Sequence, residues 1–393
     1  MSQLGLFLFI SAIVAMVTRR LRLPYTVGLV LAGIALHMLS FRSTLQLSRD
    51  LIFFVFLPPL VFEAALYIRW DELRKDLPVV GTLATVGLVA AAGITAIGMH
   101  FAMHWPWSSA AVFGVLIAAT DPVSVIATFK EAGVTGRLRL LVESESLLND
   151  GTAAVLFVVA LGIAAGTGAS LLQISGTLLL TIGGGVLSGV ATGLALMFLA
   201  GRTSDPLIEI TFTTLAAYGS FYLAEHLHCS GVLASLAAGL VAGNYSRLRF
   251  ISKSSHAALE SFWDYAAFVV NSLIFLLIGT GMTQQDFGNL WLPSLIAILL
   301  VTLGRAVAIY PVCALFTTTK LRVDMRHQHV LFWGGLRGAL ALALALGLPA
   351  DLALHDEIVT VSFAVVAFSI FAQGLTMSPF LHKLGQLRVA RGS

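Results

Sequence analysis

Charged side chains are scarce in this sequence. Asp, Glu, Lys and Arg make up 11% of the 393 residues, whereas hydrophobic residues make up 58%. Soluble globular domains carry about 25% charged residues, so the composition excludes a large soluble protein and indicates an integral membrane protein surrounded by lipid. The net charge of +3 comes from basic loops, and we expect no nucleic-acid partner.

Several kinds of functional site are also missing. The two cysteines, Cys229 and Cys313, lie in or beside apolar runs, and they indicate neither a disulfide framework nor a metal site. The ten histidines do not have metal-ligand spacing, and the P-loop, HExxH and GxSxG motifs are absent. We therefore expect no cofactor and no enzyme. Residues 1–20 lack the charged start and the cleavage site of a signal peptide, and are expected to remain as a membrane helix.

Long apolar runs are what the sequence has instead. A helix needs about 20 mostly apolar residues to cross the hydrocarbon core. We expect an all-α polytopic membrane protein, a single membrane domain over 1–393, with thirteen transmembrane helices. The thirteen runs cover residues 2–18, 24–40, 47–66, 78–101, 108–129, 141–164, 171–200, 206–226, 229–245, 263–283, 288–316, 327–349 and 357–381.

Basic residues give the expected orientation. Of the 23 Lys and Arg residues, all but four lie in loops or in the C-terminal tail on one side, if the N-terminus is outside. The exceptions are Arg42 and Arg49 on the outer side, and Arg305 and Arg337 within runs. Positive charge accumulates on the cytoplasmic side, so we expect the N-terminus outside and the C-terminus inside. Residues 246–262 are expected to form an amphipathic helix at the inner interface.

Two runs contain strong helix breakers. The fifth contains Thr120-Asp121-Pro122, where proline interrupts the helical hydrogen bonds. The twelfth contains three glycines and an arginine within residues 334–338. Transporters built from inverted repeats have broken helices at equivalent positions in both halves. We therefore expect two inverted six-helix repeats, over about 1–165 and 206–385, joined by a linker helix at about 171–200.

Four polar residues share one face of the sixth run: Glu145, Ser146, Asn149 and Asp150. Ser146 and Asp150 are four residues apart, as are Glu145 and Asn149, so each pair is adjacent on a helix. Buried ionisable residues are costly in a membrane and mark functional sites. An oxygen-rich face suits a monovalent cation, and Asp121 is expected to complete it. The alternative is that Asp150 is structural and hydrogen-bonded to other helices.

The buried charges also need partners. We expect Arg305 to pair with Glu145 and Arg337 to lie near Asp121, although the exchanged pairing stays open. Asp150 then remains for ligand exchange. A buried carboxylate that holds either a proton or a cation is the simplest basis of cation/proton exchange.

Two further features lie outside this polar face. Glu63, after Pro58-Pro59, is expected either to reach the same cavity as Asp150 or to pair with Arg69. Gly185, Gly189 and Gly193 predict a helix-packing face.

The strings FLPPLVFEAAL, AATDPVSV, ESESLLNDGTA, GRAVAIYP and GGLRGAL occur in this order. Together they resemble the cation:proton antiporters of the NhaP and animal sodium/proton exchanger type, over essentially the whole chain. The resemblance implies thirteen helices in inverted repeats, with the fifth and twelfth crossing. It also implies a core domain that moves like an elevator against a dimerisation domain, in a homodimer.

Residue by residue, the resemblance implies that Asp150 binds both the cation and the proton. Asp121, Ser146 and the Thr120 carbonyl would be co-ligands, and Glu63 contributes in some prokaryotic members. Asn149 stands where electrogenic relatives carry an aspartate, which implies electroneutral one-for-one exchange. Glu145 and Arg305 would form a structural ion pair.

We therefore expect a multi-pass antiporter of the cell membrane that exchanges Na⁺ or Li⁺ for H⁺. A K⁺/H⁺ antiporter is the nearest alternative, since oxygen ligands alone do not fix selectivity. More distant alternatives are a cation channel and an intramembrane aspartyl protease that uses Asp121 and Asp150. Such proteases need glycine on both sides of the second aspartate, whereas Asn149 precedes Asp150.

Overall fold

The computed structural model describes residues 3–21, 23–39, 47–121, 125–126, 129, 134–166, 171–245 and 253–384. Every regular element in these ranges is a helix, and three are π-helical turns, labelled η. In chain order they are α1 (Gln3–Leu21), α2 (Tyr25–Met38), η1 (Leu51–Phe56), α3 (Leu57–Leu66), α4 (Trp70–Thr82), η2 (Leu83–Gly87), α5 (Leu88–Met103), α6 (Trp107–Ala118), α8 (Arg137–Ala164), α9 (Leu171–Ala200), α10 (Pro206–His226), α11 (Gly231–Tyr245), α12 (Lys253–Met282), α13 (Trp291–Ala314), α14 (Met325–Trp333), α15 (Ala339–Leu346), α16 (His355–Phe368), η4 (Ser369–Gly374) and α17 (Leu375–Lys383).

Apolar helices account for the expected runs. Eight helical stretches among the described residues are long and apolar enough to cross a membrane, and four shorter apolar helices accompany them. Together with the pair α14 and α15, they occupy the positions of all the runs found in the sequence. The all-α class is confirmed. The number of crossings, their orientation and the inverted repeats remain predictions.

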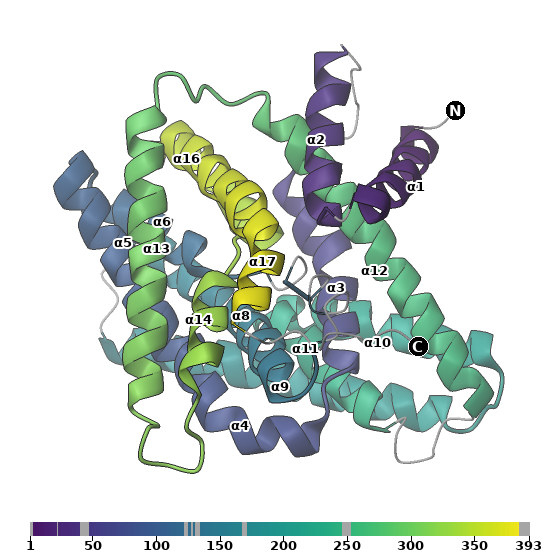
Figure 1. The fold of residues 1–393 in the computed structure, drawn as a ribbon. Helices are drawn as coiled ribbons and strands as arrows, with labels where there is room; N and C mark the ends of the chain where they lie inside the picture. The colour runs from purple at the N-terminus through teal and green to yellow at the C-terminus, as the bar shows by residue number, and fades with distance from the viewer. Residues whose placement is uncertain are drawn as a thin grey trace.

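The helices pack as two groups (Figure 1). In the first, α11 packs against α9, α10 and α3, while α12 packs against α2. In the second, α5 packs against α6 and α13, α6 packs against α8, and α13 packs against α16. Helix α8 also contacts α9, α11 and α3, so it lies where the two groups meet.

Small residues permit the close approach of helices in the first group. A Cβ atom added at Gly185 would meet the backbone of Ser230, and one added at Gly189 would meet the backbone of Ala234. Gly33 on α2 and Gly279 on α12 likewise face each other across their backbones. Dispersion contacts between closely packed backbones stabilise helix pairs in lipid. The expected packing role of the α9 glycines is confirmed.

Two helix boundaries differ from the expectation. Residues 253–262 do not form a separate interfacial helix, because they are the beginning of α12, while residues 246–252 lie outside the described residues. Helix α4 begins at Trp70 and continues through η2 into α5 as far as Met103. Both helices have polar first turns, which give no apolar signal in the sequence. In α4 this turn contains Asp71 and Glu72, and acidic residues stabilise a helix N-terminus.

The two helix interruptions lie where the breakers predict them. Helix α6 ends at Ala118, and Ala119–Asp121 are not helical. Pro122, the expected breaker, lies outside the described residues. Helix α14 ends at Trp333 and α15 begins at Ala339, so the glycine-rich segment 334–338 separates them. The chain thus presents two irregular segments within apolar surroundings.

Candidate ion-binding site

The two irregular segments are in direct contact. The backbone N–H of Asp121 donates a hydrogen bond to the carbonyl of Leu336, at 2.7 Å. The side chain of Asp121 lies so close to Gly338 that it leaves no room for a Cβ atom there. Glycine is therefore required at position 338 because the second backbone approaches the Asp121 carboxylate closely. The contact places Asp121 next to the N-terminus of α15, whose partial positive charge favours an anion.

Two arginines bind the carbonyl ends of the broken helices. The Arg337 guanidinium donates from Nη1 to the carbonyls of Ala118 and Ala119, at the end of α6. The Arg305 guanidinium donates to the carbonyl of Leu331 in the last turn of α14, at 2.9 Å from Nη2. The last carbonyls of a helix have no partner within it and carry partial negative charge. Both guanidinium groups satisfy these carbonyls inside the protein.

Arg305 also pairs with Glu145 on α8. Its Nη1 and Nη2 donate to the two carboxylate oxygens, at 2.7 and 2.9 Å. This bidentate pair is buried, and of the two pairings left open by the sequence it is the one present. In the part of the chain that the structure describes, no ion pair includes Arg337, which lies one residue from the Leu336 contact to Asp121.

Asn149 connects this ion pair to the break in the fifth run. Its Nδ2 donates to Glu145 Oε1 at 2.9 Å and to Thr120 Oγ1 at 2.6 Å. Its Oδ1 accepts a hydrogen bond from the Thr120 backbone N–H at 3.2 Å. The hydroxyl oxygens of Thr120 and Ser146 lie 3.0 Å apart. The amide and both hydroxyls are therefore held in place around Thr120.

Asp150 differs from the rest of this face. It is 7% exposed, whereas Glu145, Ser146 and Asn149 are each 1% exposed. Within the described residues it forms no hydrogen bond and no ion pair. The charged groups that act on it are Asp121, Glu145 and Arg337. A structural carboxylate bonded to other helices, the alternative from the sequence, does not match this arrangement.

Glu63 lies on α3, half-buried, on a helix that packs against α8 and α11. The sequence leaves open an ion pair between Glu63 and Arg69. Arg69, the residue before α4, pairs with Glu72 in the first turn of that helix at 2.8 Å.

The carbonyl contacts of Arg337 and the bridging position of Asn149 were not expected from the sequence. The bridging position of Asn149 could have been predicted in part, because Asn149 and Glu145 are four residues apart and therefore adjacent on a helix. The carbonyl contacts of Arg337 could not have been predicted, because no sequence pattern shows which side chain lies against the carbonyls at a helix end.

A family profile described as "Sodium/hydrogen exchanger, transmembrane" matches residues 5–383. The chain belongs to this family. It is 38% identical over 375 residues to "Na(+)/H(+) antiporter ApNhaP" from Aphanothece halophytica, which covers 93% of this chain and 70% of that protein. It is 33% identical to "Na(+)/H(+) antiporter NhaH" from Halobacillus dabanensis, over 98% of both chains.

Solved structures agree with the fold. The structure of the sodium proton antiporter MjNhaP1 from Methanocaldococcus jannaschii at pH 8 superposes with a TM-score of 0.79 over 97% of each chain, at 19% identity. The family resemblance expected from the sequence motifs is confirmed. As a member of this exchanger family the protein is an integral multi-pass membrane protein and a transporter. This membership removes the support for a channel or a protease.

Proposed function

We propose that the protein is a secondary-active antiporter that exchanges Na⁺, and also Li⁺, for H⁺ across the cell membrane. Family membership and the relatives named as Na⁺/H⁺ antiporters support this activity. The single observation that carries the mechanism is Asp150. It is the buried carboxylate on the polar face of α8 that forms no hydrogen bond and no ion pair within the described residues. Its neighbour Glu145 is held by Arg305.

In this proposal the cation binds between α8 and the broken segments. Asp150 and Asp121 supply carboxylate oxygens, and Ser146 and Thr120 supply neutral oxygens. Glu63 contributes from α3 as the ion enters or leaves. Hard monovalent cations prefer oxygen ligands of this kind. Because a bound cation and a bound proton both neutralise the Asp150 carboxylate, each ligand excludes the other.

A count of the charges where the two irregular segments lie against α8 supports one-for-one exchange. Three carboxylates, those of Asp121, Glu145 and Asp150, face the two guanidinium groups of Arg305 and Arg337. The remaining single negative charge is neutralised by one Na⁺ or by one H⁺. Asn149 adds no charge to this balance. The loaded site is therefore neutral in either form, and its movement across the membrane transfers no net charge.

For the movement itself we propose an elevator mechanism in a homodimer. The group that contains α6, α8 and the α14–α15 break would carry the ion, while the group around α9 and α11 would stay fixed and hold the dimer. The motion would follow from two inverted repeats, about 1–165 and 206–385, with a linker helix at about 171–200. An ionised, unloaded Asp150 is costly to move through an apolar barrier, so the carrier would cross only when Asp150 is neutralised.

The function is tested with purified protein in proteoliposomes. Dissipation of a pH gradient is measured side by side with Na⁺, Li⁺, K⁺ and Rb⁺, with and without an imposed membrane potential. We expect Na⁺ and Li⁺ to dissipate the gradient, with equal rates at all potentials. A response to K⁺ alone would replace the proposal with a K⁺/H⁺ antiporter. A rate that changes with the membrane potential would contradict electroneutral exchange.

A further inference from the structure

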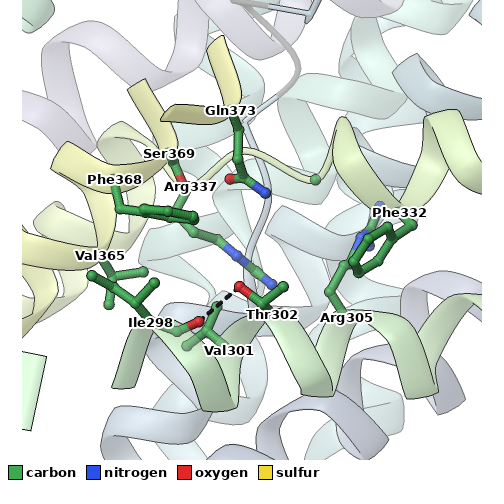
Figure 2. Close-up of a pocket in the computed structure, with 11 residues that line it drawn as sticks. Ile298, Val301, Thr302, Arg305, Phe332, Arg337, Val365, Phe368, Ser369 and Gln373 are labelled. Atoms are coloured by element: carbon green, nitrogen blue, oxygen red, sulfur yellow. Dashed lines mark hydrogen bonds between the residues drawn. The ribbon is translucent and has the colours of Figure 1, made fainter. Parts of the chain in front are cut away.

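A small cavity lies next to Arg337 (Figure 2). It is enclosed by α13, by α16 with the π-helical turn η4, and by the irregular segment that carries Gly335 and Arg337. The space open to the centre of a water molecule is about 10 Å³, which is enough for one water molecule. Its polar lining consists of Thr302, Arg337, Ser369 and Gln373, with Arg305 at the edge.

Arg337 brings unsatisfied donors to this cavity. A guanidinium group has five N–H donors, and Nη1 uses its two on the carbonyls of Ala118 and Ala119. For Nε and Nη2 no hydrogen bond exists to any residue that the structure describes. Arg337 is only 3% exposed. Donors on a buried charged group need partners, because leaving them unpaired is unfavourable.

Ser369 and Gln373 supply the complementary groups. They lie one turn apart on η4, are 1% and 6% exposed, and their side chains form no hydrogen bond with the described part of the chain. In Figure 2 the Gln373 amide points toward the Arg337 side chain. The Thr302 hydroxyl donates to the Ile298 carbonyl at 2.7 Å and keeps lone pairs free to accept. Single π-helical turns often mark functional positions, and this one places both side chains on the cavity.

We propose that this cavity is a binding site for one ordered water molecule, which accepts from the Arg337 guanidinium and bonds to Gln373 and Ser369. The polar groups share the cavity but do not bond to one another directly, so a bridging molecule is what connects them. A water molecule needs two to four polar partners, and the lining provides that number. An anion fits less well, since the carboxylates of Glu145 and Asp150 already act on Arg337.

The water would accept from the Arg337 donors that the described residues leave without a partner. With Nε and Nη2 bonded to the water, the guanidinium stays on the α6 carbonyls whichever ion is bound at Asp150. The inference depends on the cavity lining alone. It would stand if the transported cation were K⁺, and its failure would leave the transport proposal untouched.

The test is a structure of the protein at a resolution that shows ordered water, determined once in chloride and once in bromide. We expect a single density peak within hydrogen-bond distance of Arg337 and of Gln373 or Ser369, with no anomalous signal in bromide. A direct hydrogen bond from Gln373 to Arg337 with no peak would overturn the proposal. A bromide signal would overturn it in favour of an anion site.

Variants test which side chains hold the water. In the Ser369→Ala/Gln373→Leu double variant we expect the peak to disappear and the melting temperature to fall. Ser362→Ala is the matched control, because Ser362 is equally buried on the same helix but its hydroxyl donates to the Ile358 carbonyl at 2.7 Å. The control should keep the peak. A peak that persists in the double variant would show that these side chains do not bind it. The wild-type structure decides the question if the double variant does not fold.

Discussion

Glu145 and Asp150 are carboxylates of the same helix, yet their surroundings give them different tasks. Glu145 is held by two hydrogen bonds from Arg305 and one from Asn149, whereas Asp150 has no such partner among the described residues. Charge counting in the sequence favoured the Glu145–Arg305 pair, because two buried arginines need acidic partners, but it left the exchanged pairing open. It could not predict that Arg337 turns to the carbonyls of Ala118 and Ala119, since backbone carbonyls leave no trace in a sequence.

The buried ion pair gives the first prediction. Glu145→Ala leaves the Arg305 charge buried without its partner, so we expect the free energy of unfolding to fall by about 3–5 kcal/mol. Replacing Arg305 as well, in Glu145→Ala/Arg305→Met, should recover part of that loss because no unpaired charge remains. Thermal unfolding in detergent measures both variants. Equal melting temperatures for Glu145→Ala and the wild type would contradict a structural role for this pair.

Asp121 gives the second prediction, which concerns affinity. Asp121→Asn keeps the size of the side chain but removes one negative charge near the proposed cation. We expect the KM for Na⁺ to rise about tenfold, which corresponds to about 1.4 kcal/mol. Sodium-dependent proton exchange in proteoliposomes measures it. An unchanged KM would show that Asp121 does not act on the ion.

At the scale of elements, apolar runs and breakers located the apolar helices that the structure describes and both breaks, because a membrane requires long apolar stretches and because proline and glycine interrupt helices. The boundaries of α4 and α12 were missed, since their first turns are polar and extend the helix without an apolar signal. The π-helical turns were also missed. No composition pattern distinguishes Ser369–Gly374 from an ordinary helical turn.

The packing of α9 on α11 gives the third prediction. A side chain at Gly189 would meet the Ala234 backbone, whereas one at Gly183 on the same helix would meet nothing within 4 Å. We expect Gly189→Val to lower the free energy of unfolding by about 1–3 kcal/mol through overpacking. Gly183→Val is the matched control, with the same change of helix propensity. Equal loss of stability in the two variants would argue against this helix contact.

For the whole molecule, family membership and the superposition on MjNhaP1 establish the fold. The motion of one helix group against the other is our proposal. One contact between the groups is available to test it. The Arg49 side chain, just before η1, lies against Gly347 at the end of α15.

This contact gives the fourth prediction. With Cys229 and Cys313 replaced by serine, cysteines at positions 49 and 347 joined by a short thiol cross-linker should stop transport, and a cleavable linker should restore it on reduction. The control is a cross-link between positions 184 and 229, where Gly184 is replaced and Cys229 retained, because the Cys229 side chain lies against Gly184 within the group proposed to stay fixed. Transport should continue there. Full activity with the first cross-link in place would contradict the elevator.

The central claim is that Asp150 is the carboxylate that binds the cation and the proton in turn. Sodium-dependent dissipation of a pH gradient in proteoliposomes tests it, with Asp150→Asn compared against Glu143→Gln. Glu143 lies on the same helix and its carboxylate pairs with Arg139 at 2.5 Å. Its variant therefore removes a carboxylate of α8 that is not part of the proposed ion site. We predict that Asp150→Asn is folded but inactive and that Glu143→Gln retains exchange. Sodium-dependent exchange that survives Asp150→Asn would contradict the account.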